Sequence, residues 1–193
     1  MNCLHICNDL LGSKVHENLY KNLKELGINQ VIYHPIRKHS VGKLNKLDSN
    51  LLDDIRTSKV LHSLHRLFFR NKINFLYKDL QSKVDLMSFD IVHATTLFSD
   101  GALALKIFKE YGIPYIVAVR GTDVNLFIKY RYDLYSLGKE IILNAKHVIF
   151  ISDSLEINFR NSAFFKKSGL CTHEKQLVIP NGIDPYWLNN VAN

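Results

Sequence analysis

The chain has 193 residues, of which 47% are hydrophobic and 22% are charged, and its formal net charge is +7 at pH 7. This length and composition predict one globular domain and exclude a disordered chain, because the apolar residues are numerous enough to form a core. A membrane span is not expected, since the longest uncharged apolar run is far shorter than the roughly 20 residues that a bilayer requires. The first residues also lack the pattern of a secretory signal.

The cysteines indicate a reducing compartment. Cys3, Cys7 and Cys171 are odd in number and show no C-x-x-C spacing, so neither a disulfide framework nor a zinc site is expected. We therefore expect a cytoplasmic protein in which Cys3 and Cys7 are small core residues.

Short apolar runs alternate with helical stretches along the whole chain. We expect strands at 3–6, 30–34, 89–94, 113–119, 147–152 and 176–179. Apolar residues at helical spacing predict helices over 15–26, 102–111, 134–145 and 154–165, the first two ended by glycine caps at Gly27 and Gly112. This alternation predicts a doubly wound α/β fold with a mostly parallel Rossmann-like sheet and helices on both faces.

Residues 39–85 depart from this rhythm and predict a basic helical insertion. Positions 37–85 carry eleven Lys/Arg and five Asp/Glu, a net +6, whereas the rest of the chain carries fourteen and thirteen, a net +1. Lys59, His62, Arg66 and Arg70 fall on one stripe of a predicted amphipathic helix. This stripe either faces solvent or contacts anionic lipid or an acidic acceptor, and we take Lys59, Arg66 and Arg70 as the candidate contacts.

In an open α/β sheet, ligands bind beyond the carboxyl ends of the strands. Gly12 and Ser13 follow the first strand and precede a helix, where backbone N–H groups suit a phosphate. The three glycines of a dinucleotide fingerprint are absent there, which disfavours such a cofactor. His93 ends a later strand, a position that suits either a structural or a functional histidine.

The loop at 120–123, Arg-Gly-Thr-Asp, is the most polar of these strand ends. An arginine at this edge can bind a phosphate with two hydrogen bonds. The alternative is an internal ion pair between Arg120 and Asp123 that only holds the loop. No catalytic triad, metal-ligand cluster or P-loop is visible in the sequence.

Near the end of the chain, Leu177-Val-Ile-Pro-Asn-Gly-Ile-Asp184 joins a short strand to a dipeptide that favours positive φ. We expect a sharp turn at Asn181 and Gly182. No further hydrophobic strand follows to complete a hairpin.

Taken in order, the stretches 89–125, 145–159 and 177–184 resemble the N-terminal half of retaining glycosyltransferases with the GT-B fold, which consists of two Rossmann-like domains. The resemblance runs over about 1–185 and is weakest in the basic insertion. It implies that 1–184 form the N-terminal, acceptor-side domain, that 185–193 begin the interdomain linker, and that a C-terminal donor-binding domain is absent. Asn181, Gly182 and Asp184 would form the interdomain hinge.

The resemblance also implies roles for individual residues. Gly12 and Ser13 stand at the family's glycine-rich loop, which approaches the donor diphosphate, although the usual second glycine is here a serine. His93 and Arg120 are the implied catalytic residues, and Arg120 replaces a histidine found in many members. Thr122 and Asp123 would contact the acceptor or shape the loop.

The implied reaction transfers a hexose from a nucleotide-sugar to a glycan or lipid-linked acceptor with retained configuration. Neither a metal nor a cofactor is expected. Peripheral contact with an anionic membrane at its cytoplasmic face is also implied by the basic segment.

Two other functions stay open: a non-catalytic subunit of a split transferase and a basic nucleic-acid-binding module. The second is less well supported, because few aromatic residues are interleaved with the basic ones, and no nucleic-acid partner is expected.

Overall fold

The computed structural model describes residues 1–12, 14–37, 47, 49–61, 68–170 and 173–182. Its seven strands form one parallel sheet in the order β3-β2-β1-β4-β5-β6-β7. The strands are β1 (Asn2–Ile6), β2 (Asn29–His34), β3 (Ile55–Thr57), β4 (Ile91–Ala94), β5 (Tyr115–Val119), β6 (His147–Phe150) and β7 (Gln176–Val178). The helices are α1 (Lys14–Glu25), α2 (Ser49–Leu52), α3 (Phe69–Gln81), α4 (Ser99–Tyr111), α5 (Tyr135–Asn144), α6 (Asp153–Asn161) and α7 (Ala163–Ser168). Short helical turns complete the described part: η3 (Leu86–Ser88), η4 (Asp123–Ile128), η5 (Tyr132–Leu134) and η6 (His173–Lys175).

All six expected strands are confirmed, and the doubly wound α/β prediction is correct. Gly27 and Gly112 follow α1 and α4 with φ values of 77° and 72°, as expected for C-terminal caps. The strand order reverses between β1 and β4, which pair in register from Cys3 opposite Ile91 to Ile6 opposite Ala94. This reversal is a topological switch point, and its carboxyl end is where such sheets bind ligands.

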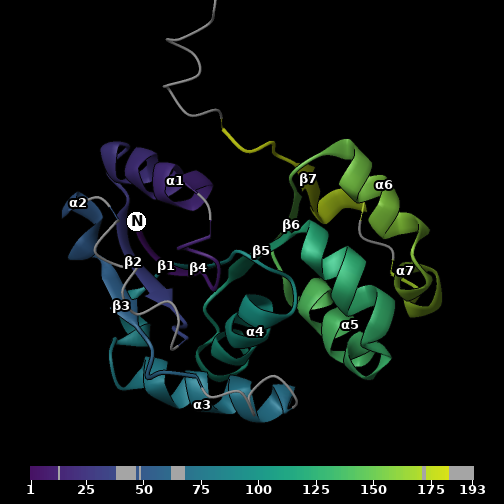
Figure 1. The fold of residues 1–193 in the computed structure, drawn as a ribbon, viewed down its shortest axis with the longest axis horizontal. Coiled ribbons are helices and arrows are strands. Elements are labelled where there is room, and N and C mark those ends of the chain that lie inside the picture. Colours follow the sequence, from purple (N-terminus) through teal and green to yellow (C-terminus); the bar gives the residue numbers. More distant parts are fainter. Residues whose placement is uncertain (13, 38–46, 48, 62–67, 171–172, 183–193) are drawn as a thin grey trace, which may run out of the picture.

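The crossover connections divide the helices between the two faces of the sheet. Figure 1 shows α1 on one side of the row of strands and α3, α4 and α5 on the other. A right-handed crossover from β1 to β2 and one from β4 to β5 run in opposite directions along the sheet, so their helices lie on opposite faces. The larger core lies under α3, α4 and α5, and a smaller cluster under α1 and α2 includes Leu10, Tyr20, Ile32 and Leu51.

The same connections leave part of the α1 face of the sheet open. Every crossover that leads to β4, β5, β6 and β7 runs in one direction and therefore lies on the α4 face. Ile91, Ile116, Ile149 and Ile151 are consequently only partly buried, although they belong to or directly follow central strands. They line a cavity of about 910 Å³ between α1 and the sheet, which we call the sheet-face cavity.

The predicted basic insertion is a mixture of helix and strand. It contains α2 and α3, but also β3, which adds a parallel edge strand next to β2. The amphipathic helix expected to begin at Lys59 is wrong at its start, because Lys59 and Val60 are not helical and Leu61 forms a parallel bridge with Arg37. His62 and Arg66 lie outside the described residues, and Arg70 lies in the first turn of α3. The prediction failed because it did not include β3, which has only three residues and so gives no clear sequence pattern. The pairing of 55–57 with β2 places the chain just before Lys59 in the sheet.

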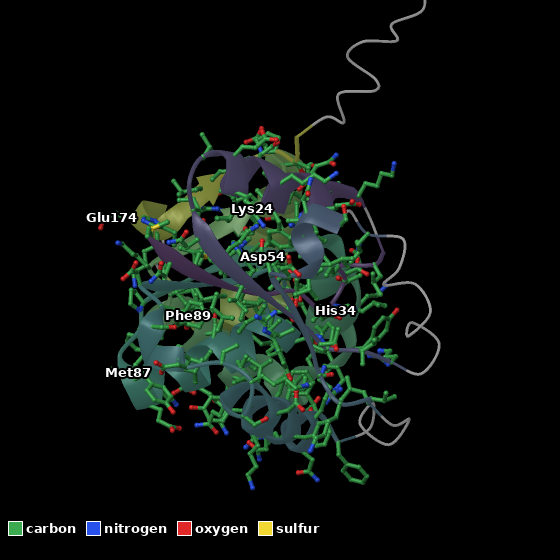
Figure 2. All side chains as sticks on the ribbon, turned by 90° about the vertical axis from the view of Figure 1, so that its left-hand side faces the viewer. Lys24, His34, Asp54, Met87, Phe89 and Glu174 are labelled. Atoms are coloured by element: carbon green, nitrogen blue, oxygen red, sulfur yellow. The ribbon has the colours of Figure 1, made fainter. Side chains whose placement is uncertain are left out.

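An ion pair fixes the insertion to α1. Lys24 Nζ lies 2.8 Å from Asp54 Oδ2 and donates a 2.7 Å hydrogen bond to Asn50 O. Figure 2 shows Lys24 and Asp54 close together in the view of this side of the molecule.

Two other expectations are corrected at the end of the chain. The helix expected over 154–165 is divided into α6 and α7 at Ser162, whose side chain accepts from Phe165 N and caps the second helix. The positive φ expected for the sharp turn at Asn181 and Gly182 is not adopted by either residue. None of the described helices is long and apolar enough to cross a membrane.

Candidate functional site

A second cavity, of about 720 Å³, lies at the carboxyl edge of the sheet, and we call it the carboxyl-edge cavity. Its wall comes from the loops after β1, β4, β5 and β6, from the first turn of α3 and from η4. The charged lining residues are Asp9, Arg37, Lys72, Arg120, Asp123 and Arg131. A volume of this size is in the range of small-molecule sites in proteins.

Arg120 lies between the two cavities and lines both. Arg120 comes directly after β5, and it is two and four residues from Ala118 and Ile116. Because alternate residues of a strand lie on the same face, Arg120 lies on the α1 side of the sheet, just beyond the end of the strand. Its Nε donates to Thr95 O at 3.2 Å and its Nη1 donates to Asn181 Oδ1 at 3.0 Å. The guanidinium is thereby held at the switch point, and it connects the end of β4 to the segment that follows β7.

Asp123 shapes the loop that presents Arg120. Its buried carboxylate accepts hydrogen bonds from the backbone N–H groups of Leu97 (3.0 Å), Phe98 (3.3 Å) and Arg120 (2.9 Å). The carboxylate of Asp123 is thus bonded to backbone N–H groups, whereas the alternative interpretation placed it in an ion pair with the Arg120 guanidinium. Burial raises the pKa of Asp123 to about 6. Thr122, next to it, is exposed and lines the carboxyl-edge cavity.

Asp100 is a second buried carboxyl group at this edge, and the sequence analysis did not single it out. Its Oδ2 accepts from Thr95 Oγ1 at 2.8 Å and Thr96 Oγ1 at 3.0 Å, which joins α4 to the end of β4. Its Oδ1 is buried without a hydrogen-bond partner among the described residues. Burial raises the pKa of Asp100 to about 6. The sequence contains one signal that could have identified Asp100: Thr95 and Thr96 precede it by five and four residues, at the start of a helix.

His93 lies on the α1 face of β4, where it is buried and lines the sheet-face cavity. Its Nδ1 is 3.0 Å from Nδ1 of His5, the residue opposite it in the register, so one ring donates and the other accepts. Burial, and then the positive charge of Arg120, lower the pKa of His93 to about 4. The ring is neutral at pH 7 and bonded within the sheet. This geometry favours a structural role, and the catalytic role of His93 stays a prediction.

The remaining predicted residues are placed as follows. Gly12 lies in the turn after β1, at the same edge as Arg120, and a Cβ atom there would come within 2.2 Å of Asp9 Oδ1. Asn181 and Gly182 line the sheet-face cavity, and Asn181 also lines the carboxyl-edge cavity. Lys59 and Arg70 are exposed. Ser13, Arg66 and Asp184 lie outside the described residues. Cys3 and Cys7 are buried, as expected, and Cys171 is also outside them.

Lys72 is the functional candidate that the sequence analysis missed. It lies in the first turns of α3, its side chain lines the carboxyl-edge cavity, and only 8% of the residue is exposed. Its Nζ donates to Ser99 Oγ at 3.0 Å and lies 4.9 Å from the centre of the Phe69 ring. Burial lowers its pKa to about 8. In the sequence, Lys72 is one of many basic residues, and no local pattern distinguishes it.

The fold and the site together define a class: a Rossmann-like protein whose polar groups gather at the carboxyl edge, beside the switch point. Within that class, residues 13–187 match the model of the family described as Glycosyltransferase Family 4. The chain belongs to this family, and its fold is that of the N-terminal domain of GT-B glycosyltransferases. No curated protein matches the chain closely enough to count as a relative.

Three solved structures illustrate the likeness. MurG from Acinetobacter baumannii is similar with a TM-score of 0.57 and 13% identity, over 95% of this chain and 46% of that one. UDP-GlcNAc 2-epimerase from Neisseria meningitidis, bound to UDP-GlcNAc, has a TM-score of 0.57 and 11% identity, over 94% and 47%. UGT89C1 from Arabidopsis thaliana, complexed with UDP-L-rhamnose, has a TM-score of 0.53 and 14% identity, over 100% and 55%.

At these identities the likeness shows the fold alone. The chain spans about half the length of the solved structures that it matches.

Proposed function

We propose that this chain forms the acceptor-side half of a retaining hexosyltransferase. The enzyme transfers a hexose from a nucleotide-sugar to a glycan or lipid-linked acceptor, at the cytoplasmic face of a membrane. The family membership supports sugar transfer. Two of the similar solved structures were determined with UDP-sugars, which supports a nucleotide-sugar donor.

The observation that carries the proposal is the position of Arg120. Its guanidinium lies at the carboxyl edge, lines the cavity there and is held by hydrogen bonds to Thr95 O and Asn181 Oδ1. An arginine fixed in this way presents donors whose geometry does not change during reaction, and such preorganised donors stabilise charge that develops in the transition state. We assign Arg120 to the developing charge of the leaving diphosphate.

The other residues support this arrangement in the proposal. Asp123 holds the loop that carries Arg120, Thr122 faces the acceptor side, and Gly12 with Ser13 approaches the donor diphosphate. Most donor contacts belong to a second Rossmann-like domain, for which Asn181, Gly182 and Asp184 form the hinge. In the proposal, the two domains close around donor and acceptor, which excludes water and positions the reactants. Such positioning can supply about 7–11 kcal/mol of the barrier. No resident metal or cofactor is required by these steps.

The test is a transfer assay on the full-length protein with a panel of radiolabelled nucleotide-sugars and an extract of membrane lipids and glycans as acceptors. We expect label in the acceptor fraction with one nucleotide-sugar, unchanged by EDTA, and NMR of the product should show the anomeric configuration of the donor. Inversion of that configuration contradicts the retaining mechanism, and hydrolysis alone with every acceptor contradicts the transferase assignment.

A further inference from the structure

The lining of the carboxyl-edge cavity is rich in cationic side chains. Its lining contains Arg37, Lys72, Arg120 and Arg131. The lining carboxylates are Asp9 and Asp123, and the second of these is occupied by three backbone N–H groups. Four cationic side chains therefore line the wall, against two carboxylates.

Lys72 is the residue that most needs an explanation. A cationic side chain that is buried without an ion pair is costly, so buried lysines are usually paired. In the part of the chain that the structure describes, no carboxylate lies within ion-pair distance of Lys72 Nζ, whose polar contact is the hydroxyl of Ser99. Asp100 attracts the ammonium group only from farther away.

Two other cations, Arg37 and Arg131, lie near enough to repel this ammonium group. Lys72 Nζ lies 4.9 Å and Arg131 Cζ lies 5.9 Å from the centre of the same Phe69 ring. Arg131 is bonded through two nitrogens to Asp133, which lies on the exposed side, away from the cavity lining. The charges of Arg37 and Arg131 both oppose protonation of Lys72. Like charges gathered around a partly desolvated cavity are favourable when a ligand supplies the opposite charge.

We propose that the carboxyl-edge cavity binds a phosphate group of the acceptor, with Lys72 as its principal contact and Arg37 and Arg131 beside it. This inference rests on the proposed function, which places the acceptor on this half of the enzyme, and it names the acceptor class: a sugar, free or lipid-linked, that carries a phosphate monoester. Several converging cations suit the double charge of a phosphate monoester better than the single charge of a carboxylate. Phe69, Leu126 and Phe127 provide an apolar wall for the rest of the acceptor.

The first test is calorimetric titration of this chain with glucose 6-phosphate as probe, beside glucose, glucuronate and UDP. We expect glucose 6-phosphate to bind at least about tenfold more tightly than glucose or glucuronate, because a charge-assisted contact is worth about 1.5–3 kcal/mol. Lys72→Met keeps the length and the apolar stem of the side chain, and it should weaken glucose 6-phosphate binding roughly 10- to 100-fold. Lys78→Met is the matched control, since Lys78 lies on the exposed side of the same helix and should have no effect.

A pH series separates a direct contact from a structural effect. Since the ammonium group of Lys72 loses its proton near pH 8, glucose 6-phosphate affinity should fall as the pH rises from 7 to 9.5. Lys72→Arg keeps its charge over this range, so its affinity should not show that fall. The charged groups facing Lys72 are Arg37, Arg131 and the carboxylate of Asp100. Arginine side chains stay protonated over this range, and Asp100, with a pKa raised to about 6, is already ionised, so these groups do not produce the fall.

Three results overturn the inference: equal affinity for glucose and glucose 6-phosphate, unchanged affinity in Lys72→Met, or loss of UDP binding alone in that variant, which would assign the cavity to the donor. These results are distinguishable from failure of the proposed function. Sugar transfer to an uncharged acceptor that is insensitive to Lys72→Met leaves the transferase standing and removes the phosphate site. If the full-length protein binds glucose 6-phosphate tightly but transfers no sugar, the phosphate site stands and the transferase assignment is removed.

Discussion

The two cavities of this protein share Arg120 but differ in origin and in chemistry. The sheet-face cavity is lined by strand residues such as Ile91, Ile116 and Ile149, and it exists because every crossover from β4 onward lies on the opposite face. The carboxyl-edge cavity is lined by loops and helix starts, and four cationic side chains line it, against three in the sheet-face cavity. Strands thus expose apolar surface where helices do not cover them, whereas charged side chains project where the chain leaves the sheet.

The largest expected effect concerns the residue between the cavities. In the full-length enzyme, Arg120→Gln should lower kcat by roughly 10²–10³, as for the loss of one preorganised donor to developing charge. Arg120→Lys should recover only part of this, because lysine keeps the charge but loses the fixed planar donors. Steady-state kinetics measure both variants. An effect confined to KM would show that Arg120 only binds substrate.

The difference in burial between the two sheet faces predicts a difference in stability. Ile6 is fully buried against the α4 side, so Ile6→Ala should lower the free energy of unfolding by about 2–5 kcal/mol. Ile116→Ala, the same substitution beside the sheet-face cavity, should cost about 1 kcal/mol, because the side chain is only partly buried and leaves little new void. Urea denaturation measures both. Similar losses would mean that the α1 face of β5 is covered in solution.

His16 in α1 and His93 on the α1 face of β4 should stay neutral in mild acid. Burial lowers the pKa of His16 and of His93 to about 4, from an ordinary value of 6.5. Because the unfolded chain then binds protons more readily than the folded one, these residues lower the free energy of unfolding as the pH falls from 6.5 to 4, by up to roughly 3 kcal/mol each. Asp100 and Asp123, whose pKa values are raised to about 6, oppose this trend.

Site-specific titration distinguishes these contributions. Two-dimensional NMR of the imidazole carbons should give midpoints near pH 4 for His16 and His93, and spectra of His16→Gln and His93→Gln assign the signals. A midpoint near 6.5 for His93 would mean that its ring is exposed to solvent, and the structural role suggested by its contact with His5 would then be wrong.

The smallest expected effect is on membrane contact. Lys59 and Arg70 are exposed, so Lys59→Glu with Arg70→Glu should weaken cosedimentation with phosphatidylserine vesicles at low salt by at least about 30-fold, since each basic residue near an anionic surface contributes about 1 kcal/mol and two are lost. Lys166→Glu with Lys167→Glu, at the distant α7, controls for net charge. If both double variants bind alike, the basic segment is not a specific membrane contact.

The sequence predicted the architecture because its signals are local. Apolar runs such as 113–119 and the caps at Gly27 and Gly112 are readable residue by residue, and they produced the correct strands and fold class. The edge strand β3 was missed because three residues carry too little pattern, and its place depends on pairing with β2. The positive φ expected at Asn181 and Gly182 is not adopted, because a dipeptide that permits positive φ does not require it; here the side chain of Asn181 accepts a hydrogen bond from Arg120.

By itself, the sequence determined the fold class, the edge of the sheet at which polar residues follow the strands, and the position of Arg120 there. The tertiary structure alone decided which groups meet. Three contacts join distant parts of the chain: the pairing of His5 with His93 across 88 positions, the bonds from Leu97 and Phe98 to Asp123, and the packing of Lys72 and Arg131 on the Phe69 ring. Burial and electrostatic environment depend on such non-local packing, so a lysine that looks like any other in the printed sequence becomes a cavity residue only when α3 packs against the carboxyl edge of the sheet.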